Sequence, residues 1–290
     1  SPPPPGDRPF VETLAEFVSE LTHDDIPKTV RTRALHHMLD AAGIALASTR
    51  YEFAHKTLAG LQAVGGQGSV PVLGMPATLP LRDAAIMNGF LCHGLDYDDT
   101  HVAAIVHPTA SVFPAVLSAA AHVGATGEEL VTAFVAGVET AARVGMVAKS
   151  QFHQVGFHPT GMVGIFGCVL AVGKLMGLNK KQLMSAQGIA VSMASGSMEF
   201  LEDGAWNKRI HPGLAAGSAI TAAAIAKEGF KGISDPYTGR FGLYNAYLGC
   251  GPRTNDIDLS LATAGLGDTW ELLATAIKPF PTCHFSHGAI

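Results

Sequence analysis

Apolar residues recur at the three- and four-residue spacing of an α-helix along most of the chain. The helices whose bounds this pattern predicts cover residues 10–21, 24–47, 81–95, 111–123 and 215–228. Prolines near the start of the second and third helices are typical of helix N-termini. Strand evidence is confined to one short candidate, residues 69–74. The pattern therefore predicts an all-α fold.

Capping signals predict two more helices. Segments 126–129 (TGEE) and 179–182 (NKKQ) have the spacing of a capping box. On the first of these helices, Glu139 and Arg143 lie four residues apart and are expected to pair. Many of the helices are rich in Ala, Gly and Ser, which allow close backbone approach. We therefore expect a dense helical bundle, and the change of texture after Phe230 suggests a boundary.

Composition narrows the class of protein. Charged residues make up 15% of the 290 residues, against roughly 25% in a typical domain. So little charge indicates extensive helix-on-helix burial and an oligomer. The apolar runs 103–127 and 162–173 are interrupted by His and Pro or are short, unlike the ~20 clean residues of a spanning helix. The proline-rich start, residues 1–9, is expected to be a disordered tail and lacks the features of a signal peptide.

These observations exclude several partners and chemistries. We expect a cytoplasmic protein with no membrane partner, and a net charge of −5 argues against nucleic acid. The four cysteines form no CxxC pair, which argues against structural zinc and a disulfide scaffold. No HxxxH or HExxH spacing occurs, so we expect no metal. GxSxG, GxGxxG and Walker motifs are also missing, which disfavours a serine hydrolase or a nucleotide site.

Polar segments interrupt the apolar helices next to glycine or proline at residues 96–107, 156–161, 203–213 and 278–287. Three of them contain or adjoin a His–Pro dipeptide, at His107, His158 and His211. Proline at the first helical position would place each histidine at a helix N-terminus. There the helix dipole favours anions and a neutral imidazole, as in a pocket for carboxylates with a histidine base. Asp98 and His101 are expected only to cap a helix or to face solvent.

The sequences within these segments resemble the MmgE/PrpD family, which includes 2-methylcitrate dehydratase, cis-aconitate decarboxylase and iminodisuccinate epimerase. The matching blocks are LDYDDTHVAAIVHP, GFHPTG, DGAWNKRIHPGLAAGS and KPFPTCHFSH, in the family's order. The resemblance implies a helical domain, here residues 10–267, and a smaller α+β lid domain. Residues 268–290 would begin that lid, and the rest of it is absent from this chain. It further implies a homodimer without metal or organic cofactor, and an active site between the domains.

The resemblance also implies which residues form the site. It transfers the family's site positions to Asp96, Thr100, His107, His158, Lys208 and Lys278, and to either Cys283 or His284. A gapless alignment selects Cys283, and a shift of one residue selects His284.

The implied substrates are small di- and tricarboxylates that react at a carbon next to a carboxylate. The cations expected to bind the carboxylates are Lys208, Arg209 and Lys278. His107 or His158 would act as a base. Asp96, if buried, would have a raised pKa and act as an acid, or would orient a histidine.

Three activities share this chemistry. A dehydratase of the 2-methylcitrate type, which eliminates hydroxide, is the first expectation. An epimerase that reprotonates the opposite face and a decarboxylase that releases CO₂ are the alternatives. An alternative of another class is a catalytically silent domain that only dimerises, since the lid is absent.

Overall fold

The structure, a computed structural model, describes residues 9–249 and 256–290, so residues 1–8 of the expected tail and Cys250 lie outside it. In chain order the α-helices and strands are α1 Phe10–Glu20, α2 Lys28–Ser48, α3 Glu52–Gly65, β1 Val70–Pro71, β2 Thr78–Leu79, α4 Leu81–His93, β3 Thr100–His101, α5 Pro108–Val123, α6 Gly127–Val147, α7 Gln151–Gln154, α8 Pro159–Leu175, α9 Lys180–Ala190, α10 Phe200–Asp203, α11 Asn207–Lys227, α12 Leu243–Leu248 and β4 Thr275–Ala276. Short 3₁₀ helices are η1 Val191–Met193, η2 Leu259–Ala262, η3 Glu271–Ala274 and η4 His284–Ala289.

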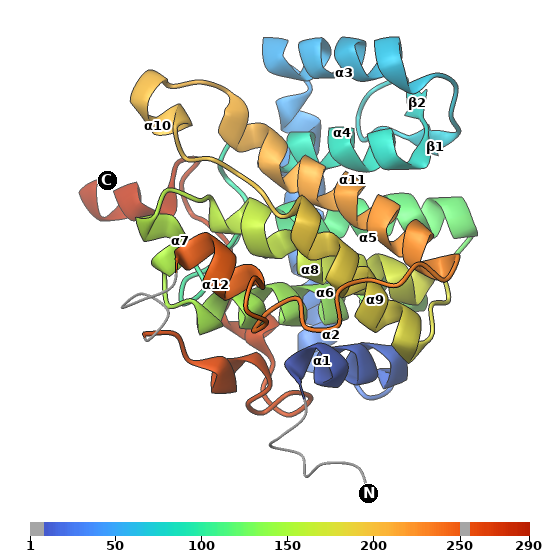
Figure 1. Cartoon of the computed structure of the whole chain (residues 1–290). Coiled ribbons are helices and arrows are strands. Elements are labelled where there is room, and N and C mark those ends of the chain that lie inside the picture. Colours follow the sequence, from blue (N-terminus) through green and yellow to red (C-terminus); the bar gives the residue numbers. More distant parts are fainter. Residues whose placement is uncertain (1–8, 250–255) are drawn as a thin grey trace, which may run out of the picture.

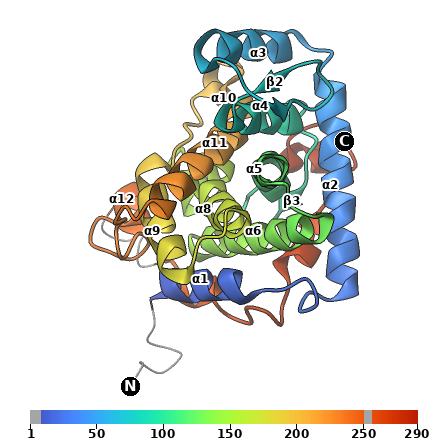
Figure 2. The same ribbon diagram turned by 90° about the vertical axis from the view of Figure 1, so that its right-hand side faces the viewer.

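The bundle is organised around α8, which packs against α5, α6, α9 and α11 (Figure 1). Residues 159–173 of α8 are buried without interruption, as expected for a helix that is apolar on every side. Figure 2 looks down α5, which lies between α4, α6 and α2. The expected all-α architecture is confirmed.

Small residues let these helices approach closely. A Cβ atom on Gly167 of α8 would lie 2.3 Å from the carbonyl oxygen of Gly137 on α6. A Cβ atom on Gly89 of α4 would lie 2.6 Å from the Cα of Gly213 on α11. Since no side chain fits at either crossing, the Gly-rich texture of the sequence is a packing requirement.

Both predicted capping boxes are present. The Thr126 hydroxyl accepts from the Glu129 backbone N–H at 3.2 Å, and the Asn179 side chain accepts from Gln182 at 2.9 Å. The helix expected over residues 24–47 instead begins at Lys28. Asp25 does not cap it, because its carboxylate accepts from the Thr22 hydroxyl and backbone N–H. The expected strand at 69–74 shortens to two residues that pair with β2.

One helix in the described part of the chain, α6, is long and apolar enough to cross a membrane by length and composition alone. Of its most apolar window, 89% is buried inside the bundle, as in the core helix of a globular domain. The cytoplasmic location stays a prediction.

The predicted Glu139–Arg143 pair is buried and ties the C-terminal segment to α6. Arg143 Nε lies 3.5 Å from Glu139, and both side chains are almost wholly inaccessible. The Glu139 carboxylate accepts the backbone N–H groups of Glu271 and Leu272 at 3.0 and 2.9 Å. Arg143 donates to the Ala264 carbonyl at 2.6 Å. The anchored residues immediately precede β4, which pairs antiparallel with β3. The expected boundary between residues 267 and 268 stays a prediction.

Candidate active site

The loop that follows α4 places Asp96 between two lysines from distant parts of the chain. Asp96 has a φ of 52°, in the left-handed region that few non-glycine residues adopt. Lys208 from the first turn of α11 donates to Asp96 Oδ2 at 2.6 Å. Lys278 donates to Asp96 Oδ1 at 2.9 Å and to its backbone carbonyl at 2.8 Å. The site is thus assembled from three separate segments.

The charge state of Asp96 differs from the sequence-based expectation. Burial acts to raise its pKa, but the charges of His93, Lys208 and Lys278 outweigh burial and hold the pKa well below its ordinary value. Asp96 is therefore an ionised carboxylate that orients cations, and not the neutral acid that a raised pKa would give.

His107 is held at the start of α5, as predicted from its His–Pro dipeptide. Its Nδ1 lies 2.7 Å from the Asp99 carbonyl and 3.2 Å from the Thr100 hydroxyl. A carbonyl only accepts, so Nδ1 carries the hydrogen and Nε2 is left as a proton acceptor. Burial lowers the pKa of His107 to about 4, although the charge of Asp98 opposes the shift. At neutral pH the ring is an uncharged base.

His158 takes the same position at the start of α8. Its Nδ1 pairs with Nδ1 of His211 at 2.9 Å, and its ring centroid lies 6.1 Å from that of His107. Burial and the neighbouring His93 and His107 place the pKa of His158 well below its ordinary value. Two neutral imidazoles therefore face one another, both on helix N-termini.

The third His–Pro dipeptide behaves differently from the prediction. Pro212 lies inside α11, which begins five residues earlier at Asn207, so His211 does not start a helix. This early start puts Lys208 and Arg209 in the first turn. Arg209 Nε donates to the Gly94 carbonyl at 2.9 Å, and its guanidinium stacks on Phe53 at 4.7 Å. Arg209 thus packs at the edge of the site, beside the Asp96 loop.

The C-terminal segment brings the remaining predicted residues to the same place. Lys278 follows β4 by two residues, and its side chain is completely buried. Cys283 lines every one of the three small cavities around the predicted residues. His284 lines the smallest of these, about 50 Å³, together with Thr100 and His107. The two candidates for the last site position are therefore both adjacent to His107.

Two adjoining cavities form the interior of the site. The first, about 320 Å³, is charged and is lined by Asp96, Lys208 and Arg209. The second, about 220 Å³, is lined by His107, His158 and apolar side chains such as Met198 and Phe285. Phe200, Leu201, Lys208 and Cys283 line both. We call the first cavity the charged chamber and the second the apolar chamber; Lys208 lies where they meet.

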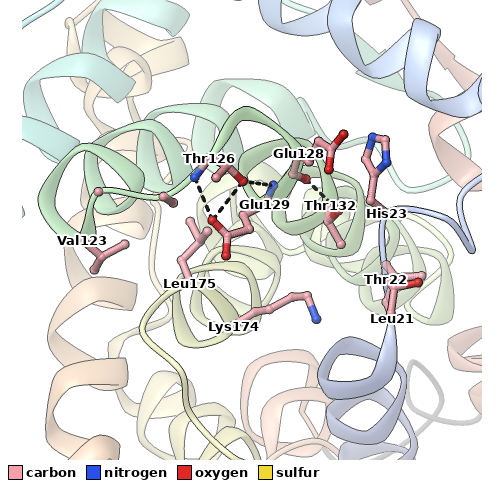
Figure 3. Close-up of a pocket in the computed structure, with 12 residues that line it drawn as sticks. Leu21, Thr22, His23, Val123, Thr126, Glu128, Glu129, Thr132, Lys174 and Leu175 are labelled. Carbon is pink, nitrogen blue, oxygen red and sulfur yellow. Dashed lines mark hydrogen bonds between the residues drawn. The ribbon is translucent and has the colours of Figure 1, made fainter.

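A larger cavity lies elsewhere, between the segment that follows α1, the junction of α5 with α6, and the end of α8 (Figure 3). Its polar groups already have structural partners. Glu129 belongs to the capping box of α6, and Lys174 donates to the Val18 carbonyl at 2.8 Å. Its size of about 650 Å³ therefore does not make it the functional site.

Several functional candidates were missed or misjudged from sequence. Asp98 and His101 are fully buried instead of solvent-facing. His101 bonds to Glu271 at 2.8 Å, while Asp98 binds the ring of His93. His93 was not anticipated, although its place at the end of α4, five residues before Asp98, was a readable signal. The Asp99 carboxylate accepts from the backbone N–H and hydroxyl of Thr109, and its Oδ2 lies 2.6 Å from Nδ1 of His37. These contacts anchor the loop after α4 to α2 and α5.

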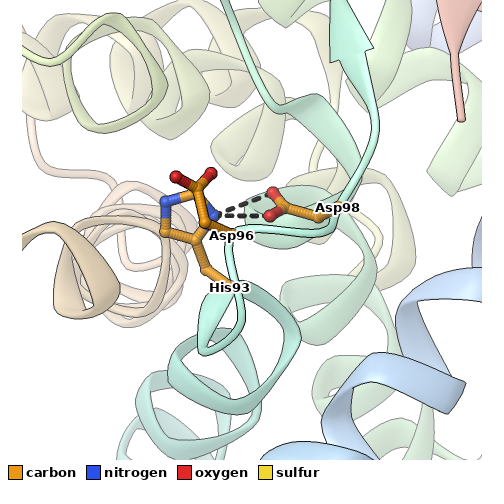
Figure 4. Close-up of side chains that lie close together, drawn as sticks. All are labelled: His93, Asp96 and Asp98. Atoms are coloured by element: carbon orange, nitrogen blue, oxygen red, sulfur yellow. Dashed lines mark hydrogen bonds and ion pairs between the residues drawn. The ribbon is translucent and has the colours of Figure 1, made fainter. Parts of the chain in front are cut away.

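The described residues include one compact group of potential metal ligands, His93, Asp96 and Asp98 (Figure 4). Both Asp96 oxygens are already occupied by lysine ammonium groups. A cation at this point would be repelled by those charges. The geometry therefore fits an anion better than a metal ion, and the absence of a cofactor stays a prediction.

The fold and the site together define a helical domain that gathers carboxylate-binding lysines and neutral histidines in its interior. The chain belongs to the MmgE/PrpD family, since residues 12–254 match the MmgE/PrpD N-terminal domain. It is 29% identical to cis-aconitate decarboxylase of Aspergillus terreus over 287 residues, 96% of this chain and 58% of that protein. It is 31% identical to human cis-aconitate decarboxylase over 230 residues, 77% of this chain and 47% of that protein. The chain therefore spans about half the length of these relatives.

Proposed function

We propose that this chain forms the helical part of the active site of a cofactor-independent carboxy-lyase that acts on cis-aconitate. The observation that carries the proposal is the Lys208–Asp96–Lys278 cluster beside two neutral histidines. Its support from outside the geometry is that the curated relatives are named for decarboxylation of this tricarboxylate. They favour the decarboxylase alternative over the 2-methylcitrate dehydratase that we first expected.

The charges of the site suit a polycarboxylate. Asp96 neutralises only one of its two lysines, so a net positive charge remains for a substrate carboxylate. We assign the retained carboxylates to the charged chamber at Lys208. The carboxylate that leaves as CO₂ would lie in the apolar chamber, where its charge is poorly solvated and its loss is favoured. His107 and His158 both line that chamber, as proton transfer requires.

The test compares substrates on the same preparation. The protein is incubated in D₂O with cis-aconitate, 2-methylcitrate or iminodisuccinate and followed by NMR. A decarboxylase releases CO₂ from cis-aconitate and leaves deuterium on the product carbon. Loss of water from 2-methylcitrate would instead support the dehydratase, and inversion of iminodisuccinate the epimerase.

Variants assign the histidines. His107→Ala and His158→Ala should each lower turnover at least ~10²-fold, the usual cost of losing a placed acid or base. Near-normal turnover in both variants would contradict the assignment of these histidines as catalytic residues. His122→Ala, at the exposed end of α5, is the matched control and should retain full activity.

A catalytically silent dimerisation domain is the second candidate, and one observation favours it. The outer face of α2 exposes Leu35, Leu39 and Leu46, with Leu39 74% accessible. An apolar stripe of this kind is typical of an interaction surface. Size-exclusion chromatography with light scattering tests the homodimer. A dimer without turnover of any of the three substrates would support this candidate over the enzyme.

A further inference from the structure

A buried imidazole nitrogen in the site has no partner in the described structure. His93 is 1% exposed, and its Nδ1 lies 2.9 and 2.8 Å from the two oxygens of Asp98. Its Nε2 is buried without a hydrogen bond. Figure 4 shows this second nitrogen on the side of the ring away from Asp98. His93 lines the charged chamber with Asp96 and Lys208, so a ligand there would satisfy the orphaned atom.

The carboxylate behind His93 is ionised. Burial of Asp98 acts to raise its pKa, but the charges of His93 and His107 and the hydrogen bond from His93 hold the pKa below its ordinary value. An ionised carboxylate on Nδ1 fixes the orientation of the ring and leaves Nε2 as the nitrogen available to a ligand. The charged and titratable groups around His93 are Asp96 and Asp98 on the loop after α4, His107 on α5, His158 on α8, Lys208 and His211 on α11, and Lys278 in the C-terminal segment.

The other histidines of the cluster do not have this support. The His107 and His158 rings lie 5.2 and 5.6 Å from His93. Burial lowers the pKa of His107 and of His211 to about 4. Neither they nor His158 carry a hydrogen-bonded carboxylate, and His107 gives its one ring hydrogen to a backbone carbonyl. They are proton acceptors at neutral pH, whereas the decarboxylation step needs a proton donor.

We propose that His93 is the proton donor of this site and that Asp98 is the residue that positions it. The assignment rests on the proposed function for its substrate, a β,γ-unsaturated tricarboxylate. It adds a catalytic residue to the set that sequence and resemblance predicted.

The proton balance of the step is simple. The bond between the departing carboxylate and its carbon breaks, and its electron pair becomes a new carbon–carbon double bond. The electron pair of the original double bond takes the proton from His93 Nε2 and becomes a C–H bond. CO₂ leaves, and His93 becomes neutral with its remaining hydrogen on Nδ1, held by Asp98. A proton from solvent restores the imidazolium.

NMR of the protein with ¹⁵N-labelled histidine reads the charge of each ring directly. At pH 7 we expect an imidazolium pattern for His93 and neutral patterns for His107, His158 and His211. Asp98→Asn should convert His93 to the neutral pattern. Saturating tricarballylate, a tricarboxylate that cannot react, should shift the His93 Nε2 signal in the wild type. A neutral His93 at pH 7, or an unmoved Nε2 signal under saturation, would overturn the proposal.

Kinetics provide the second arm. His93→Gln places an amide near Nε2 that donates a hydrogen bond but cannot transfer a proton. It should lower kcat on cis-aconitate at least ~10²-fold while KM changes little. His36→Gln, on the exposed side of α2, is the matched control and should leave kcat unchanged. A His93→Gln enzyme within about threefold of wild type, by the same kinetic criterion, would overturn the proposal.

The two arms separate this inference from the function on which it rests. If the wild type does not decarboxylate cis-aconitate but its charged His93 responds to tricarballylate, the proposed function fails and His93 stands as the donor to a bound carboxylate. If cis-aconitate is decarboxylated while His93 is neutral, the function stands and the assignment of the donor fails.

Discussion

Lys278 donates to both the carboxylate and the backbone carbonyl of Asp96, a residue 182 positions earlier in the chain. A single ammonium group thereby fixes the side chain of Asp96 and its left-handed backbone. The contact also links the C-terminal segment to the loop that carries Asp98, Asp99 and Thr100. The position of Lys278 and the local stability of this loop are therefore coupled.

Lys278→Met should remove both the binding charge and this link. We expect a loss of ~1–3 kcal/mol in the free energy of unfolding, below the full cost of breaking a buried pair because Asp96 is partly exposed and retains Lys208. Affinity for tricarballylate should fall about tenfold, the effect of losing ~1.4 kcal/mol. Urea denaturation and calorimetry measure the two effects. Lys180→Met removes two partly exposed ion pairs, to Glu12 and Glu16, and should cost under ~1 kcal/mol. Equal losses in both variants would contradict the argument.

The pKa of His107, about 4 in the folded protein against 6.5 ordinarily, predicts a pH dependence of stability. Between these values the unfolded chain binds more protons at this position than the folded chain, so stability rises with pH. The contribution is complete above pH 6.5 and is lost as the pH falls from 6.5 toward 4. Denaturation at several pH values should show a smaller slope over this window in His107→Gln. An unchanged slope would show that the ring titrates normally.

Glu139→Gln should loosen the C-terminal segment without disturbing the bundle. A glutamine oxygen can accept only in place of one carboxylate oxygen, and its NH₂ group would face the second backbone N–H. We expect a cost of ~1–3 kcal/mol for the unsatisfied donors. Hydrogen exchange should become faster around Leu272 and Thr275, and turnover should fall because Lys278 follows β4. Unchanged exchange in this segment would remove Glu139 from its anchoring role.

Gly167→Ala should destabilise the centre of the bundle. The added methyl group would lie 2.3 Å from the Gly137 carbonyl oxygen, so α6 and α8 must move apart at a cost of ~1–3 kcal/mol or more. Gly43→Ala on α2 is the control, because nothing lies within 4 Å of its Cβ position. It should stabilise the helix by ~0.5–1 kcal/mol. Thermal unfolding of the two variants should therefore shift in opposite directions.

The sequence predicted the bounds of a helix where its hydrophobic periodicity and its capping residues indicate the same start. The boxes at Thr126 and Asn179 mark α6 and α9 to the residue. The α8 helix has no polar face, so its apolar run gave no helical period and its bounds were not predicted. The start of α11 was missed because Pro212 reads as a first-turn proline, while the helix begins at Asn207.

The sequence predicted most of the residues that form the candidate site, but it did not predict their protonation states. The resemblance selected Asp96, Lys208 and Lys278, which the structure brings within hydrogen-bonding distance. The expectation of a raised pKa for Asp96 considered burial alone, because sequence does not show that two ammonium groups converge on one carboxylate. His93 was missed because its spacing to Asp98 was overlooked, and the sequence does not show that its second ring nitrogen has no hydrogen-bond partner.

The β3–β4 pairing has a consequence for the order in which this protein acquires its function. The contact of α4 with α11 already joins distant parts of the chain, and the pairing of Thr100 with Ala276 closes a still longer loop. Such a closure is entropically costly and is a late event in folding. A ribosome that has released only the helical body has made a folded bundle whose Asp96 still lacks its buried cation. A chain that stops before residue 275 lacks Lys278, so the contact of Asp96 with this buried cation is the last part of the candidate site to form.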